Sequence, residues 1–373
     1  MTLFTTFELE RWQSVWEHRV RYNLSESGVH PMSIRELLEL AGHELDELAD
    51  IRMGYGQGDG SDVLRAAIAA LYPGATDEHV TVTVGSSEAN FVICWTLIEP
   101  GDRIAILTPV YKQTWGLAQN FGGEVSCFNL SFGRDWEPDP DEIARAITAD
   151  TKLVIVTNPN NPTGHALSDA ARGAILEQTR AAGAWLLTDE VYLGAELDGR
   201  PTASFWGSYE RVVVVNGLSK AYGLPGLRIG WIVAPLEFKD AAIRRHDYTV
   251  ICPSPASDFL ARAALSVRER ILERTRNILN INYPVLERWL TGFDGLFEWR
   301  APDCGAICLV RYSHPMPALE LVEHVRADHD ILLVPGEHFD MPGHLRLGYG
   351  NEHSELQAAL GELKPALENL LAD

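Results

Sequence analysis

The sequence has little of what a membrane-bound, secreted or nucleic-acid-binding protein needs. Its 373 residues hold 31 basic against 52 acidic side chains, and the net charge of −21 argues against a surface for nucleic acid or an anionic membrane. No apolar run approaches the length of a membrane helix, and Glu8 and Glu10 stand where a signal peptide would be basic and then apolar. We therefore expect a cytoplasmic protein.

Cysteine is also scarce. The five cysteines are scattered and mostly set in apolar runs, such as FVICW at 91–95, which is typical of buried thiols in a reducing compartment. Cys304 and Cys308 lie four residues apart, but no second pair or histidine cluster stands at ligand spacing. We therefore expect no metal site.

The 46% hydrophobic content is sufficient for a large core. Predicted strands alternate with helices and carry polar residues at their ends, which favours a doubly wound α/β fold with a crevice at the carboxyl ends of the strands. After about residue 257, a long helical stretch leads to a smaller α+β segment. We expect an N-terminal arm at 1–35, a large domain at 36–256 and a small C-terminal domain at 257–373.

The stretch 211–233 (RVVVVNGLSKAYGLPGLRIGWIV) places a lysine after a buried strand. Burial there would desolvate Lys220, which lowers the pKa of its amine and makes it a nucleophile able to form a Schiff base with an aldehyde. Arg228, eight residues on, would supply a fixed cation for a phosphate. The alternative is a surface lysine that follows a core strand.

A predicted strand at 79–85 leads through Gly85, Ser86 and Ser87 into a helix. Free backbone N–H groups and the helix dipole make such a junction a ready anion site, although an ordinary N-cap serine gives the same pattern. A second strand ends before Tyr111, whose ring could face a ligand or pack in the core.

The most specific motif is NPNNPTG at 158–164, a rigid turn that holds the amide of Asn161 at a strand end. Asp189 ends the strand-like AWLLTDEVY, where a carboxylate is costly unless it is paired; a helix cap is the alternative. Arg346, in HLRLGYG, suits a bidentate grip on a substrate carboxylate, and a surface salt bridge is the alternative.

These motifs together resemble those of the class I/II aminotransferases, the fold-type I enzymes that depend on pyridoxal 5'-phosphate (PLP). The resemblance covers nearly the whole chain and implies that PLP is bound through Lys220. It also implies a set of cofactor-binding residues: Tyr55, Ser86, Ser87, Tyr111, Asn161, Asp189, Tyr192, Ser219 and Arg228. Asn161 and Arg346 would contact the substrate. Tyr55 would reach the phosphate of a neighbouring subunit, so the resemblance implies a homodimer.

One departure concerns the phosphate. Relatives commonly carry a hydroxyl residue two positions before Ser219, where this chain has Gly217, which leaves one phosphate contact in doubt.

Shorter segments resemble the capreomycidine synthase-type enzymes, which cyclise a hydroxyarginine. They are SGVH (27–30), GSSEA (85–89), LSKAYGLPGLRIGW (218–231), HDYT (246–249) and VPGEHF (334–339). The likeness implies a substrate with a long guanidino side chain, contacted by Gly28, His30 and Glu26. For His30 the alternative is a turn residue, and for Glu26 a solvated loop acid.

The resemblance implies a PLP-dependent enzyme acting on an α-amino acid, first of all an aminotransferase that yields a 2-oxo acid. The alternative is a β/γ-eliminating lyase or cyclase acting on arginine, canavanine or a hydroxyarginine-like amino acid. A non-catalytic regulator of the same fold is disfavoured, because the sequence shows no basic helix-turn-helix segment.

Overall fold

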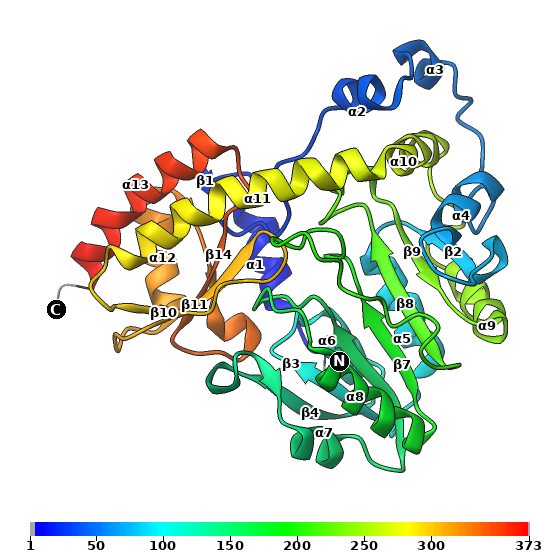
Figure 1. Cartoon of the computed structure of the whole chain (residues 1–373), viewed down its shortest axis with the longest axis horizontal. Coiled ribbons are helices and arrows are strands. Elements are labelled where there is room, and N and C mark those ends of the chain that lie inside the picture. The colour runs from blue at the N-terminus through cyan, green and yellow to red at the C-terminus, as the bar shows by residue number, and fades with distance from the viewer. Residues whose placement is uncertain (1–3, 372–373) are drawn as a thin grey trace.

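An eight-stranded sheet forms the centre of the larger part of the structure, a computed structural model that describes residues 4–371 (Figure 1). The strand order is β2-β9-β8-β7-β6-β3-β4-β5. The central pairs are parallel, whereas β9 runs antiparallel to both neighbours and β5 antiparallel to β4. This confirms the predicted doubly wound, mostly parallel sheet. The strands are β2 (Val80–Thr83), β3 (Arg103–Thr108), β4 (Glu124–Ser131), β5 (Glu137–Pro138), β6 (Thr151–Thr157), β7 (Trp185–Asp189), β8 (Val212–Gly217) and β9 (Gly230–Val233).

Both faces of this sheet are buried. Because successive side chains of a strand point to opposite faces, Val212 and Val214 join one hydrophobic cluster and Val213 and Val215 another. The first cluster also contains residues of four helices: α4 (Asp62–Ala69), α7 (Pro140–Ala146), α8 (Asp169–Ala182) and α10 (Pro255–Ser266). The second contains residues of three helices: α5 (Ser86–Leu97), α6 (Gln113–Asn120) and α9 (Leu236–His246). The run of valines thus follows from burial on both sides.

The smaller part contains an antiparallel sheet in the order β10-β11-β14-β13. The strands are β10 (Phe297–Trp299), β11 (Ile307–Tyr312), β13 (Val334–Pro335) and β14 (His344–Gly348), and the helices beside them are α12 (Ala318–His329) and α13 (His353–Leu370). The long helix α11 (Arg268–Thr291) runs between the two parts (Figure 1). This is the predicted smaller α+β unit. The expected boundary between the two domains, after residue 256, stays a prediction.

The N-terminal segment connects the two parts. The Thr5 backbone N–H donates to the Asn120 side chain of α6 at 2.7 Å, and the indole of Trp12, in α1 (Glu8–Trp16), donates to the Leu333 carbonyl at 2.9 Å. The short β1 (Tyr22–Asn23) then pairs with β12 (Ile331–Leu332). Helix α2 (Ile34–Ala41) packs against α10 through the buried Leu37 and Leu38, whereas α3 (Leu45–Ala49) has no buried residue and lies at the periphery (Figure 1).

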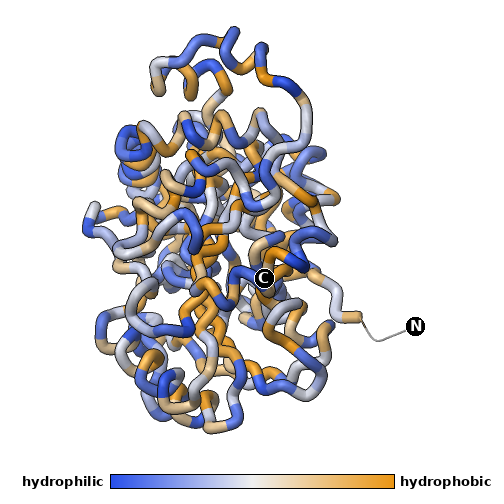
Figure 2. Tube along the Cα trace, turned by 90° about the vertical axis from the view of Figure 1, so that its right-hand side faces the viewer, coloured by the Kyte–Doolittle hydropathy of each residue, from blue (hydrophilic) through white to orange (hydrophobic). Residues whose placement is uncertain are grey.

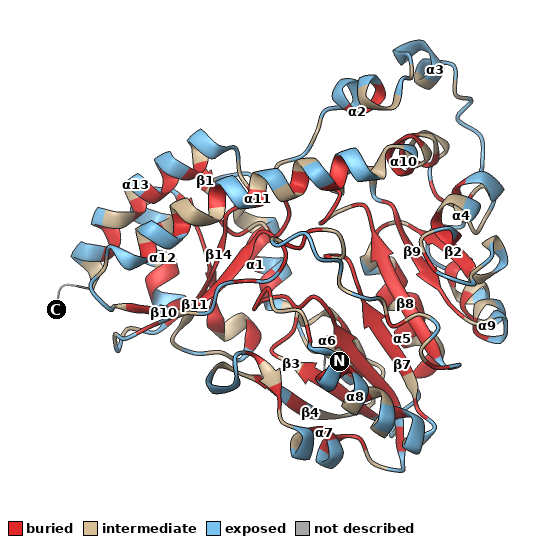
Figure 3. Ribbon diagram, in the orientation of Figure 1, coloured by how far each residue is buried: buried red, intermediate tan, exposed pale blue. Residues whose placement is uncertain are grey.

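Hydrophobic residues concentrate along the interior of the chain trace (Figure 2), and the strands of the large sheet are buried whereas most helices show one exposed side (Figure 3). Among the described residues, no helix combines the length and apolar character that crossing a membrane requires. Three cysteines are buried as expected, but Cys127 is exposed and Cys252 partly so. Cys127 lies on β4, where the short edge strand β5 pairs only with Leu130 and Ser131 and does not reach Cys127.

Candidate active site

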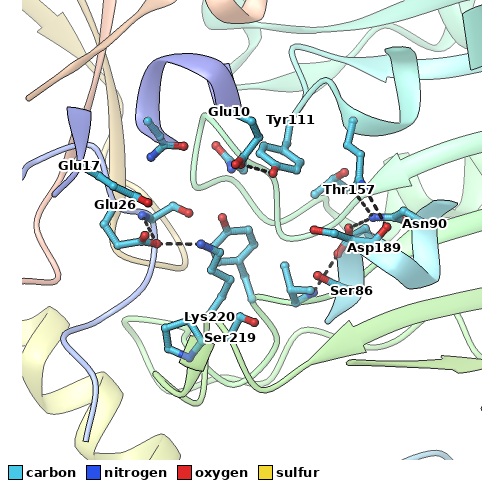
Figure 4. Close-up of a pocket in the computed structure, with 18 of the residues that line it drawn as sticks. Glu10, Glu17, Glu26, Ser86, Asn90, Tyr111, Thr157, Asp189, Ser219 and Lys220 are labelled. Atoms are coloured by element: carbon cyan, nitrogen blue, oxygen red, sulfur yellow. Dashed lines mark hydrogen bonds and ion pairs between the residues drawn. The ribbon is translucent and has the colours of Figure 1, made fainter. Parts of the chain in front are cut away.

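A cavity of about 570 Å³ lies at the carboxyl ends of the parallel strands, between the large sheet, the N-terminal helix α1 and strand β14 (Figure 4). This volume and position are typical of small-molecule sites in α/β folds. The cavity brings together most of the residues that the sequence singled out: Glu26, Ser86, Ser87, Tyr111, Asn161, Asp189, Tyr192, Ser219, Lys220, Arg228 and Arg346.

Lys220 follows β8 and reaches into the cavity, where its Nζ lies 2.7 Å from Oε1 of Glu26. Burial lowers the pKa of Lys220, but the Glu26 carboxylate opposes this, and the net pKa is raised above its usual value. The expected lowering is therefore wrong for this structure, because its counter-ion lies 194 positions away in the sequence. Glu26 is thus not merely a solvated loop acid.

The Glu26 carboxylate is itself held in place. Its Oε1 accepts hydrogen bonds from the backbone N–H groups of Ser27 at 2.8 Å and Gly28 at 3.0 Å. Burial raises the pKa of Glu26, but Lys220 and these two N–H groups outweigh it and lower the pKa to about 2. Glu26 is therefore an anion at neutral pH.

One corner of the cavity is built for an anion. Helix α5 begins after Gly85, which has a φ of 78° and offers no side chain to cap the first turn. A Cβ added to Gly85 would lie 2.4 Å from Nη2 of Arg228, so the guanidinium lies directly against the helix N-terminus. Arg228 itself has a φ of 51°, a conformation that costs about 1 kcal/mol or more for a residue with a side chain. The helix dipole and this fixed cation both favour a negative ligand.

Gly217 does not line the cavity. A Cβ there would lie 3.0 Å from the Ile229 carbonyl oxygen and 3.1 Å from Cα of Gly230, its partner in β9. Close approach of two strands therefore explains why this position holds a glycine.

Asp189, at the end of β7, is 8% exposed and paired with an amide. Its Oδ2 accepts a hydrogen bond from Nδ2 of Asn90 at 2.9 Å, and its Oδ1 accepts one from the Val191 N–H at 3.3 Å. Burial raises the pKa of Asp189, and the Asn90 hydrogen bond opposes this. The sequence analysis missed Asn90, although it lies four residues after Ser86 and so on the same face of α5.

Arg346, on β14, is only 1% exposed. Its Nη1 donates to Oδ1 of Asn161 at 2.9 Å. Among the described residues, its Nε is buried without a hydrogen-bond partner, and no carboxylate forms an ion pair with the guanidinium. This excludes a surface salt bridge. A buried guanidinium without a counter-ion is costly, and a ligand carboxylate in the cavity would compensate it.

Two tyrosines complete the inner wall. Tyr192 is 3% exposed; burial raises its pKa, and Lys220 opposes the rise. The Tyr111 hydroxyl donates to the Glu10 carboxylate of α1, and the ring of Phe7 contacts the Tyr111 ring at a centroid distance of 4.8 Å. Burial, and then Glu10, raise the pKa of Tyr111 well above its usual value.

Helix α1 provides a wall that the sequence analysis did not assign to the site. Glu10 and Gln13 of α1, and Glu17 just after it, line the cavity. Figure 4 shows Glu17 and Glu26 on the side opposite Asp189, and Glu10 between these two sides, beside Tyr111. A helical pattern at the N-terminus was visible in the sequence, but no local signal indicated which strand ends it would cover.

Three predicted residues lie elsewhere. Tyr55, between α3 and α4, is 88% exposed and lines a separate hollow. Gly28 and His30 line a neighbouring cavity of about 270 Å³, which shares Glu26 and Ser219 with the first.

His30 is more than a turn residue. Its Nδ1 lies 3.0 Å from Nη2 of Arg274 and 3.0 Å from Oε1 of Glu352. Burial and Arg274 lower the pKa of His30, so that the neutral ring is favoured.

Comparison with known proteins agrees with this geometry. The profile of the family "Aminotransferase class I and II" matches residues 33–363. Capreomycidine synthase of Streptomyces vinaceus is 30% identical over 364 residues, which cover 96% of this chain and 93% of that protein. A PLP-dependent aminotransferase from Streptococcus suis 89-1591 superimposes with a TM-score of 0.93 at 30% identity, over 99% of both chains. The PLP-dependent cyclase OrfR does so with a TM-score of 0.91 at 29% identity, also over 99% of both chains.

The family profile covers most of the chain, and the similarity to solved PLP-dependent enzymes covers nearly all of it. The chain therefore belongs to the class I and II aminotransferase family, whose members are PLP-dependent enzymes of fold type I.

Proposed function

We propose that this chain is a PLP-dependent enzyme that acts on an α-amino acid, in the first place an aminotransferase that passes the amino group to a 2-oxo acid. The observation that carries the proposal is that one cavity contains a lysine amine, an anion-binding corner, a buried acid–amide pair and a buried guanidinium. Each of these groups suits a different part of the cofactor or of an amino acid.

The side chains fit PLP. The N-terminus of α5, after Gly85, would hold the phosphate together with Arg228. The two lie side by side, because a Cβ added to Gly85 would contact the Arg228 guanidinium. Asp189 would hold a proton on the pyridine nitrogen, because a buried carboxylate favours a nearby positive charge. The other contacts are those that the family resemblance implied, from Ser86, Ser87, Tyr111, Asn161, Tyr192 and Ser219. When bound, PLP supplies an electron sink for negative charge at the substrate Cα.

The protein supplies binding, orientation and proton movement. The buried fork of Arg346 would bind the substrate carboxylate, and its hydrogen bond to Asn161 would fix the plane of the guanidinium. Lys220 would hold the cofactor through its amine and, once released, move the proton at the substrate Cα. Helix α1 would keep water away from the reacting atoms.

A homodimer is part of the proposal. Residues 34–55 expose several large apolar side chains: Ile34 (47%), Leu45 (48%), Met53 (78%) and Tyr55 (88%). In a homodimer, Tyr55 would contact the phosphate site of the other subunit. Sedimentation velocity tests this proposal, and a monomer with full PLP affinity would contradict it.

A second candidate function is elimination or cyclisation of a guanidino amino acid, such as arginine, canavanine or a hydroxyarginine. The specific observation in its favour is the carboxylate wall of Glu10, Glu17 and Glu26, which would attract a cationic side chain. Similarity to capreomycidine synthase and to the cyclase OrfR supports the same candidate.

One experiment tests the proposal and separates the two reactions. The PLP-loaded protein is mixed, without any 2-oxo acid, with single amino acids including arginine and canavanine, while cofactor absorbance and products are followed. An aminotransferase stops after one equivalent and resumes when a 2-oxo acid is added. A lyase or cyclase continues and releases a side-chain fragment or a ring product. No spectral change with PLP itself would refute both functions.

A further inference from the structure

Glu26 occupies an unusual place for a carboxylate in such a site. Its Oε1 lies 2.7 Å from the amine of Lys220, the group that the proposed function requires as a neutral nucleophile (Figure 4). An ion pair of this length stabilises the ammonium, which cannot attack an aldehyde.

The Glu26 carboxylate is fixed within its own loop, and this loop packs on the turn that carries Lys220. Ser27 and Gly28 donate their backbone N–H groups to the same Oε1 atom. Gly28 in turn lies against this turn, because a Cβ there would be 3.3 Å from the Ser219 carbonyl oxygen and 3.7 Å from Cα of Lys220. The packing of the two loops therefore brings Glu26 and Lys220 together, so the ion pair does not depend on the flexibility of two long side chains.

The other charged or titratable groups facing Lys220 cannot replace Glu26. Arg346 carries the same charge, and burial keeps Tyr192 neutral by raising its pKa. Asp189 is held by Asn90. Within residues 4–371, Glu26 is the carboxylate in ion-pair contact with Lys220.

We propose that Glu26 is a positioning residue for Lys220, which holds the amine as an ammonium at the cavity wall before the cofactor attaches. The inference rests on the proposed function. Before attachment the ammonium leaves Glu26 and gives one proton to water. The amine then adds to the aldehyde carbon, a C=N bond forms, and the carbonyl oxygen departs as water. When a substrate amine displaces the lysine, Nζ leaves as a neutral amine, and the Glu26 carboxylate can accept a hydrogen bond from it and keep it beside the reacting atoms.

The test measures how fast PLP attaches to the cofactor-free protein over a range of pH, followed by the visible absorbance of the attached cofactor. The variants are Glu26→Gln, which keeps the accepting oxygen, and Glu17→Gln, which removes a charge from the same cavity without touching Lys220. With Glu26→Gln we expect the pH midpoint to fall by about one unit, so that attachment at lower pH is about tenfold faster. With Glu17→Gln the midpoint should stay at the wild-type value.

Two further measurements separate this inference from folding defects and from the proposed function. Pyridoxine 5'-phosphate has no aldehyde, so Glu26→Gln should bind it as tightly as the wild type, and a large loss would overturn the inference. In the cofactor-free wild type, the pH dependence of Lys220 acetylation should show a pKa above that of an ordinary lysine. If the wild type binds neither phosphate compound, the proposed function fails. If PLP attaches to Lys220 with the same pH midpoint in the wild type and in Glu26→Gln, only the role of Glu26 is refuted.

Discussion

Replacing Arg346 by methionine should separate the activity of this protein from its stability. The change removes a buried guanidinium that donates to Asn161 and whose Nε has no partner in the described part of the chain. If Arg346 binds the substrate carboxylate, its loss removes charge-assisted hydrogen bonds worth about 1.5–3 kcal/mol each. Because 1.4 kcal/mol corresponds to a factor of ten, losing a two-bond fork should lower kcat/KM by about 100-fold or more.

The free energy of unfolding should change much less. An apolar side chain of similar volume in place of a buried, unpaired charge is often neutral or stabilising, while the Oδ1 of Asn161 left without its donor costs about 1–3 kcal/mol. These effects oppose one another, so we expect Tm to stay within about 4 °C of the wild-type value.

The assays are steady-state kinetics with the best amino acid found and a thermal melt of the PLP-loaded protein. Arg346→Lys is the matched control, because it keeps the charge but loses the planar fork, and it should recover only part of the lost kcat/KM. A methionine variant that keeps kcat/KM within twofold would refute the assignment of Arg346. Equal losses of activity, PLP absorbance and Tm would show instead that Arg346 is a structural residue.

Two further predictions follow from the anion corner and from the Glu26 ion pair. Gly85→Ala brings a Cβ to 2.4 Å from Arg228, so PLP affinity should fall by at least about tenfold while the weak binding of pyridoxal, which lacks the phosphate, is unchanged. The matched control is Gly74→Ala, which has the same φ of 78° but no atom within 4 Å of the new Cβ; equal losses of PLP affinity in both variants would contradict the phosphate assignment. Glu26 has a folded pKa of about 2, below the value of about 4.3 for an unfolded chain, so its contribution to stability is present above that value and is lost as the pH falls towards 2. Urea unfolding of wild type and Glu26→Gln should therefore differ at pH 7 and converge near pH 2, and a difference that does not depend on pH would show that the charge of Glu26 contributes no stability.

Local patterns were sufficient for much of the fold. The valines of β8 and the alternation of strands with helices indicate a sheet buried on both faces, because side-chain periodicity reports burial directly. The motif around Asn161 and the carboxylate of Asp189 could be placed at strand ends. Since parallel strands of one sheet end at one edge, their convergence in a cavity could also be expected.

The sequence by itself thus determined the fold class, the family and the strand-end residues, each of which is encoded by a short segment of chain. Only the tertiary structure decided that α1 covers the cavity with carboxylates, that Asn90 pairs with Asp189, and that Glu26 raises the pKa of Lys220 where burial alone would lower it. The physical reason is that a pKa and a binding surface depend on distances in space, and the chain brings Glu26 to 2.7 Å from a lysine 194 positions away.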